Sequence, residues 1–214
     1  MKLLSQNSAL RHASKLTGER VMNFGIPALE TPEGKRTCPF AGACQQYCYA
    51  KRGAYLWSNV APVYRKRYEA TLRPDFPTLM LKEIQERKPT YLRVHDAGDW
   101  YSREYRDKWF HVIENSPHVR FYTYTKSVPL FKEVLHIPDN LSVVFSLGGT
   151  RDDLVDLTKD RHARIFDSVE ALEAAGYVNA SANDLLACRW RNPDHRVGLV
   201  WNGANRSKAL AQNA

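Results

Sequence analysis

The stretch TYLRVHDAGDWYSREYRDKWFHVIENS, residues 90–116, contains the structural unit that the rest of the chain repeats. Residues 90–98 predict a buried strand that ends at Gly98. Residues 102–116 then predict an amphipathic helix. Four apolar side chains recur there at helical spacing: Tyr105, Trp109, Val112 and Ile113. The stretch therefore predicts a strand followed by a helix that packs against it.

The same alternation of strand and helix extends in both directions from this unit. Further strands are expected at 20–29, 119–125, 140–149, 162–168 and 177–181. Helices are expected within 58–86 and at 128–136, 151–160 and 169–176. Strands that alternate with helices favour a parallel sheet with crossover helices. We therefore expect an α/β fold, a partial (β/α)6 barrel-like parallel sheet.

Nothing in the chain marks a boundary between domains. Its 214 residues are 43% hydrophobic and 25% charged, as in an ordinary globular protein. We find no internal repeat and no linker, and we expect a single domain over 1–214. Within it, residues 37–53 form a cysteine-rich loop, and the part from about 177 to 214 is less regular.

Charge and hydropathy limit the partners of the chain. No run of about 18 apolar residues predicts a membrane span, and the first residues lack the apolar stretch of a secretory signal. We therefore expect a cytoplasmic protein without a membrane partner. The net charge of +8 permits phosphate-bearing partners, including nucleic acid. The one tight basic run, at 64–67, is expected on a solvated helix face.

Polar and glycine-rich residues follow four of the predicted strands. These exits are the cysteine loop, HDAGDW (95–100), YTYTKS (122–127) and SLGGT (146–150). In parallel sheets, ligands bind beyond the carboxyl ends of the strands. We therefore expect these four exits to share one rim and to form the functional site.

Three of the four cysteines lie within the loop, at the spacing C-x5-C-x3-C: Cys38, Cys44 and Cys48. Zinc loops usually pair their cysteines more closely and supply four ligands, whereas a [4Fe–4S] cubane takes one thiolate per iron. Three thiolates would leave one iron open, unless Cys188 is the fourth ligand. We expect a [4Fe–4S] cluster here, with a zinc site and metal-free structural thiols as the alternatives.

Two family resemblances strengthen this interpretation. The stretch CQQYC (44–48) resembles the second half of the radical S-adenosylmethionine motif, whose usual spacing is C-x3-C-x2-C. The chain is also similar to the phage-associated gene product 88 family. The matching motifs are N-S-x-L (7–10), G-I-P-A (25–28), T-C-P-x-A-x-x-C-x-x-x-C-Y-A (37–50) and R-x-H-x-x-G-D-W-Y-S (93–102). The second resemblance implies a phage protein that acts in the host cytoplasm.

The radical S-adenosylmethionine resemblance implies that the open iron chelates the amino and carboxylate groups of the methionine. The second strand exit would then contact the amino group. Asp99 is favoured over Asp96 as the acceptor, and Gly98 allows a close approach. An alternative role for Asp99 is the N-cap of the helix that begins near Ser102. An electron donor for the cluster is the implied partner.

Other exits supply further cofactor-binding candidates. Ser146 is expected to bond a ribose hydroxyl, and Thr125 is a further candidate. Lys126 is expected to meet a carboxylate or phosphate, with a solvated turn lysine as the alternative. Tyr47 is expected to shield the cluster or stack on a ring.

We expect structural roles for two residues of the second strand. We expect His95 to be a core histidine, and Arg93 to pair with an acid inside the barrel.

Two further functions remain open at this point. If Cys188 is the fourth ligand, the cluster is closed, and the chain is a structural, redox-sensing or macromolecule-binding protein. If an iron is open without reductive chemistry, the cluster is a Lewis acid. The number of thiolate ligands separates the closed cluster from the open one.

Overall fold

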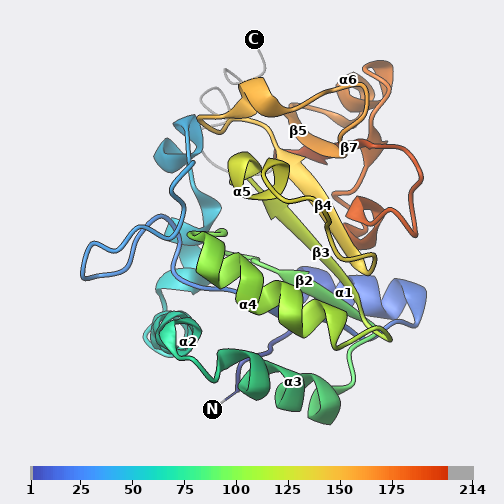
Figure 1. Cartoon of the computed structure of the whole chain (residues 1–214). Helices are drawn as coiled ribbons and strands as arrows, with labels where there is room; N and C mark the ends of the chain where they lie inside the picture. Colours follow the sequence, from blue (N-terminus) through green and yellow to red (C-terminus); the bar gives the residue numbers. More distant parts are fainter. Residues whose placement is uncertain (1, 202–214) are drawn as a thin grey trace.

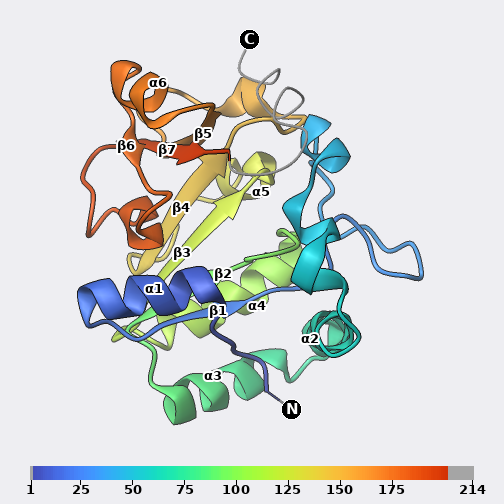
Figure 2. The ribbon, with the colours of Figure 1, turned by 180° about the vertical axis from the view of Figure 1, so that it is seen from behind.

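The computed structural model describes residues 2–201, and its centre is one curved, all-parallel sheet. Within these residues the strand order is β1-β2-β3-β4-β5-β7-β6. The strands are β1 (Val21–Phe24), β2 (Tyr91–Val94), β3 (Arg120–Thr125), β4 (Leu141–Ser146), β5 (His162–Phe166), β6 (Val178–Asn179) and β7 (Arg196–Val200). Figures 1 and 2 show the sheet curling into a half-barrel. The expected parallel α/β architecture is confirmed, with seven strands where the sequence predicted six.

Helices cover both faces of the sheet. They are α1 (Ser8–Thr17), α2 (Ala61–Leu72), α3 (Phe76–Arg87), α4 (Arg103–Glu114), α5 (Val128–Lys132) and α6 (Val169–Ala174). On the outer face, α3, α4 and α5 pack around a core that includes Trp100, Trp109 and Phe121. Figure 2 shows α1 on the opposite, inner face. There it packs with the 3₁₀ turn η5 (Asp184–Ala187) over a second, smaller core.

Alternation along the strands distributes the side chains between these two cores. In β3, Phe121 faces the outer core and Tyr122 the inner core. All four residues of β1 are buried, as expected for a parallel strand that is covered on both faces.

The segment 151–160 differs from its prediction as a helix. It contains only the short 3₁₀ turn η4 (Asp152–Leu154). Asp152 accepts hydrogen bonds from the Gly148 and Gly149 N–H groups (2.6 and 3.0 Å). Asp160 accepts one from the Asp156 N–H group (2.7 Å). These aspartate side chains offer the backbone a local alternative to the helix.

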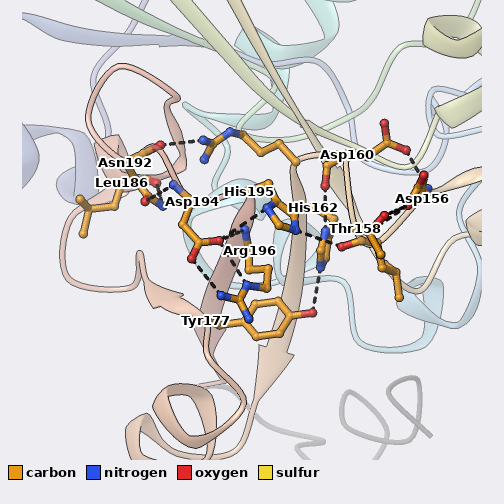
Figure 3. A network of polar contacts seen from close by, with 12 residues as sticks. Asp156, Thr158, Asp160, His162, Tyr177, Leu186, Asn192, Asp194, His195 and Arg196 are labelled. Carbon is orange, nitrogen blue, oxygen red and sulfur yellow. Dashed lines mark hydrogen bonds and ion pairs between the residues drawn. The ribbon is translucent and has the colours of Figure 1, made fainter.

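A polar network joins β5 to β7 at the far side of the sheet (Figure 3). His162 is 1% exposed, and its two ring nitrogens pair with the Asp160 carbonyl oxygen (2.9 Å) and the Tyr177 hydroxyl (2.8 Å). The backbone N–H group of His162 also donates to the His195 carbonyl oxygen (2.8 Å). This network holds β5 against β7. A strand was expected at 162–168, whereas β7 lies in the part that the sequence indicated only as less regular.

The basic run at 64–67 is not uniformly solvated. Arg67 is 2% exposed, and its guanidinium carbon lies 5.4 Å from the centre of the Tyr64 ring. Arg65, by contrast, is exposed and pairs with Glu33 and Glu69. The expectation of a solvated face is therefore wrong for Arg67, whose side chain packs between α2 and the sheet.

None of the helices in residues 2–201 combines the length and apolar character that crossing a membrane requires.

Candidate functional site

A cavity of about 190 Å³ lies at the carboxyl ends of the strands, beneath the cysteine loop. Its walls include Cys38, Cys44 and Cys48, which come from the segment between β1 and α2. In Figure 1 this segment, blue to cyan, lies on the side toward which β3 and β4 point. Residues from the exits of β2, β3 and β4 also line the cavity. The expected shared rim is therefore present.

Three hydrogen bonds fix the start of the cysteine loop to its neighbouring segments. The Thr37 hydroxyl donates to the Pro27 carbonyl oxygen (2.6 Å), and the Asp99 N–H group donates to the Thr37 carbonyl oxygen (3.0 Å). The Leu29 N–H group donates to the Cys38 Sγ atom (3.3 Å). In iron–sulfur sites, N–H donors such as this one form hydrogen bonds to the sulfur atoms.

The middle of the loop packs against the exit of β4. Ala41 forms an isolated bridge with Gly149, and the Thr150 N–H group donates to the Phe40 carbonyl oxygen (3.0 Å). A Cβ atom on Gly42 would lie 2.5 Å from the Gly148 carbonyl oxygen. Only glycine fits at position 42 while the loop stays in contact with β4.

Burial sets the protonation of the three thiols. It raises the pKa of Cys38, and the nearby Asp99 carboxylate raises it further. Burial also raises the pKa of Cys44 and of Cys48, although the Lys126 ammonium opposes this at Cys44. In the free protein the thiols are therefore protonated at neutral pH. Binding a metal would release these protons, because the thiolate is the ligand.

Lys126 places an ammonium group among the residues that line the cavity. Its Nζ atom donates to the Ser146 carbonyl oxygen (2.8 Å), the Ser146 hydroxyl (3.1 Å) and the Leu147 carbonyl oxygen (2.5 Å). Burial lowers the pKa of Lys126, while Cys44 and nearby carboxylates raise it. The side chain thus ties the exit of β3 to that of β4 and places a positive charge beside the thiols.

Asp99 organises the β3 exit. Its carboxylate accepts hydrogen bonds from the Trp100 N–H group (2.8 Å), the Thr125 hydroxyl (2.6 Å) and the Lys126 N–H group (2.9 Å). Burial raises the pKa of Asp99 despite these bonds. The alternative role as an N-cap is wrong, because Ser102 caps α4. Both carboxylate oxygens already have partners within the protein.

The remaining cofactor-binding candidates of the rim also line the cavity: Tyr47, Gly98, Thr125 and Ser146. Gly98 has a φ of +76°, and a Cβ atom there would lie 2.2 Å from the Ile26 side chain. Tyr47 is 3% exposed, and its ring packs edge-on against Trp201 with centres 5.4 Å apart.

Asp96 lies apart from the cavity. Its Oδ2 atom accepts from the Tyr64 hydroxyl (2.8 Å) and from the Asn7 side-chain amide (3.4 Å), on the side of α1 and α2. Its carbonyl oxygen accepts from the Tyr49 hydroxyl (2.5 Å). Asp96 therefore fastens the segments around the loop.

Cys188 is also elsewhere. Its side chain is fully buried in the inner core with residues such as Leu10 and Tyr122. Among residues 2–201, the cavity is lined by the three loop cysteines and not by Cys188.

No three His, Cys, Asp or Glu side chains within residues 2–201 are grouped to hold one metal ion. A cubane has a different requirement, because each thiolate binds its own iron. The donor set of the cavity, three thiols with a backbone N–H group at Cys38 and an ammonium nearby, suits such a cluster.

Three residues that line the cavity were not predicted from the sequence: Tyr124, Leu199 and Trp201. Tyr124 precedes Thr125 on β3, and alternation along that strand is the signal that points it inward. Leu199 and Trp201 come from β7 and its end, a strand that the sequence did not predict.

The acid expected to pair with Arg93 is confirmed as Asp184, 3.0 Å from the Arg93 Nη1 atom.

Comparison with known proteins identifies the family. The sequence model of the gene product 88 family matches residues 1–213. The chain belongs to the gene product 88 family. The Gene 88 protein of Mycobacterium phage L5 is 29% identical over 143 residues, which is 60% of this chain and 59% of that protein. The Gene 88 protein of Mycobacterium phage D29 is 30% identical over 124 residues, 51% of each chain.

The matched part of this chain thus spans between half and three fifths of the length of these two relatives. No solved structure matches it.

Proposed function

We propose that Cys38, Cys44 and Cys48 bind a [4Fe–4S] cluster and leave one iron open toward the cavity. The observation that carries this proposal is that the three thiols line one cavity at the carboxyl edge of a parallel half-barrel. Cys188 lies in the inner core instead, which favours three protein ligands over four. The spacing C-x5-C-x3-C is longer than the usual C-x3-C-x2-C, but the three cysteines still line one cavity.

We further propose that the chain is a compact radical S-adenosylmethionine-type enzyme. When bound, such a cluster would pass one electron from an external donor to S-adenosylmethionine for its reductive cleavage. The residues of this chain would hold the reactants and exclude water. Tyr47 and Tyr49 line the cavity from the loop side. With the cluster bound, the Lys126 ammonium would offset part of the negative charge of the thiolates.

We place this chemistry in the cytoplasm of a phage-infected host, with an electron-donor protein as partner. The four cysteines are free, which suits a reducing compartment, and the two relatives come from phages.

The first experiment measures iron and S-adenosylmethionine binding together. The chain is purified anaerobically and reconstituted with iron and sulfide, and we expect about four irons per chain. Electron paramagnetic resonance of the reduced protein is then recorded with and without S-adenosylmethionine. We expect a changed signal when the ligand is added, because it binds at the open iron.

Cysteine variants supply the matched controls. Cys38→Ala, Cys44→Ala and Cys48→Ala should each lose most of the iron, whereas Cys188→Ala should retain it. Loss of the cluster in Cys188→Ala, with no response to S-adenosylmethionine, would establish a closed cluster and overturn the enzyme proposal. A chain that takes up no iron would overturn both proposals.

A further inference from the structure

A row of alternating arginine and aromatic side chains lies at the amino ends of the strands, away from the cavity. Its members are, in order, Arg189, Trp190, Arg120, Tyr91 and Arg191. Each guanidinium carbon lies 5.0–5.7 Å from the centre of a neighbouring ring. Contacts of this kind between a cation and an aromatic ring are attractive. The arginine–aromatic row therefore holds three cations in place.

Neighbouring segments anchor the arginine–aromatic row to the sheet. Tyr91 and Arg120 are the first residues of β2 and β3, and they are paired in register. The backbone N–H group of Arg189 donates to the Ser142 hydroxyl near the start of β4 (3.2 Å). The Arg189 guanidinium donates to the Asp139 carbonyl oxygen, just before the same strand. The row thus crosses the amino ends of three strands, whereas the cavity lies at their carboxyl ends.

The charges of the row are crowded and only partly neutralised. Arg120 Nη1 and Arg191 Nε both donate to the Tyr91 hydroxyl, at 2.8 and 3.1 Å, so two guanidinium groups lie beside one oxygen atom. Among the described residues, Glu19 is the carboxylate that pairs with the row, through Arg191. Arg120 and Arg189 are exposed and form no ion pair with a described residue. An anion placed across these like charges would be attracted and would relieve their repulsion.

The form of the row limits the kind of anion. A small anion would contact one or two of the guanidinium groups, whereas a chain of repeating phosphates can contact all three. Each guanidinium also presents paired N–H donors that match two oxygens of a phosphate. An acidic protein would need an exposed apolar centre for its interface, but Tyr91 is 1% exposed and Trp190 is partly buried. The row therefore fits a nucleic acid better than an acidic protein.

We propose that the arginine–aromatic row binds the phosphodiester backbone of a nucleic acid. Phosphates are the same at every nucleotide, so this binding is independent of base sequence. The net charge of +8 adds a long-range attraction for the same partner. This inference goes beyond the proposed cluster chemistry, because the row and the cavity lie at opposite ends of the strands.

Fluorescence anisotropy of the iron-free full chain with end-labelled DNA tests the inference. The probes are a single strand of about 16 nucleotides and the duplex of that strand with its complement. Titrations at several salt concentrations give the affinity and its salt dependence. We expect the logarithm of the affinity to fall linearly with the logarithm of the salt concentration, with a slope of about one per phosphate contact. Binding to either form of DNA supports the inference, and the tighter complex identifies the preferred form.

Arginine variants assign the binding to the row. Arg120→Gln and Arg189→Gln should each lower the salt slope by about one, and the double variant should weaken binding at least about tenfold. The double variant Arg120→Lys/Arg189→Lys keeps both charges and should bind more tightly than the glutamine pair. The matched control, Lys66→Gln/Lys82→Gln, removes the same charge from exposed positions on α2 and α3 and should bind like the wild type.

The single variants carry the test even where the double variant fails to fold, and melting temperatures show which variants are folded. The inference is overturned if neither DNA binds, or if the folded arginine variants bind as tightly as the lysine control. Poly-glutamate that competes as well as unlabelled DNA would also overturn it, because the row would then recognise carboxylates as readily as phosphates. The measurement requires no iron, so its outcome is independent of the proposed cluster.

Discussion

His95 shows how the strand exit stabilises an uncharged imidazole. The residue follows β2 with a φ of +69°, a conformation that few non-glycine residues adopt. Its ring is 3% exposed, pairs with the Tyr105 hydroxyl (2.9 Å) and packs edge-on against Trp100. Burial, reinforced by the positive charge of Arg93, lowers the pKa of His95 to about 3. The prediction of a core histidine is confirmed.

This lowered pKa predicts a loss of stability in mild acid. The unfolded chain protonates His95 below pH ~6.5, but the folded protein does not until about pH 3. The stabilisation is therefore complete above pH ~6.5 and declines as the pH falls toward 3. Between pH 7 and 5 we expect the free energy of unfolding to fall by about 2 kcal/mol from this residue.

Urea unfolding at pH 7 and pH 5 measures this loss. His95→Gln should remove most of it, and His12→Gln, at an exposed position on α1, should leave it unchanged. An equally steep pH dependence in His95→Gln would show that other groups, such as the buried His162, account for it.

Lys126 has a structural role that is separable from any cluster. Lys126→Met leaves the Ser146 and Leu147 carbonyl oxygens without their donor. We expect the free energy of unfolding of the iron-free chain to fall by about 2 kcal/mol, as measured by urea denaturation. Lys66→Met, at an exposed position on α2, is the matched control. Equal stabilities of the two variants would contradict this role.

At the scale of elements, sequence reasoning succeeded where one periodic segment matched one element. The amphipathic pattern of 102–116 corresponds to α4, and the strand at 119–125 corresponds to β3. The rim of the cavity followed from a general rule of parallel sheets. That rule requires only the strand ends, which glycine and polar residues mark in the sequence.

The failures have local physical causes. The helix α1 was not predicted, although Asn7 caps its start by accepting from the Leu10 N–H group and Gly18 ends it in a left-handed conformation. The strand β7 was also not predicted, and its place in the sheet depends on pairing with β5 and β6 on either side. Asp96 and Asp99 both follow the second strand in HDAGDW, so the sequence did not separate their roles. In the folded chain, Asp96 instead accepts a hydrogen bond from the Tyr64 hydroxyl.

The contact between the cysteine loop and β4 predicts the effect of a single methyl group. Gly42→Ala would bring a Cβ atom to 2.5 Å from the Gly148 carbonyl oxygen, so the loop must move away from the strand exit. We expect less iron per chain after reconstitution and a free energy of unfolding lower by about 1–3 kcal/mol. Ala43→Ser, at the adjacent exposed position, should change neither. Full iron uptake by Gly42→Ala would show that this packing does not position the thiols.

At the scale of the whole molecule, the sheet is open, because no strand within residues 2–201 joins its two edges into a closed barrel. Other elements must therefore cover its concave face. The sheet runs from β1 at one edge to β6 at the other. The helix α1 and the turn η5 fill the space between, over the inner core that contains Cys188. The ion pair of Arg93 and Asp184 fastens η5 to β2. The same pair thus supports the cavity wall and closes the fold.

Breaking this ion pair should destabilise the whole chain. Asp184→Ala leaves the Arg93 guanidinium buried without its counter-charge, and we expect the free energy of unfolding to fall by about 3–5 kcal/mol. Faster hydrogen exchange across residues 184–200 should accompany this loss, since η5 is no longer fastened to β2. The double variant Arg93→Met/Asp184→Leu should recover most of the stability, because apolar residues can replace a buried pair. If the double variant is as unstable as Asp184→Ala, the closure of the concave face depends on the charges themselves and not on removing an unpaired one.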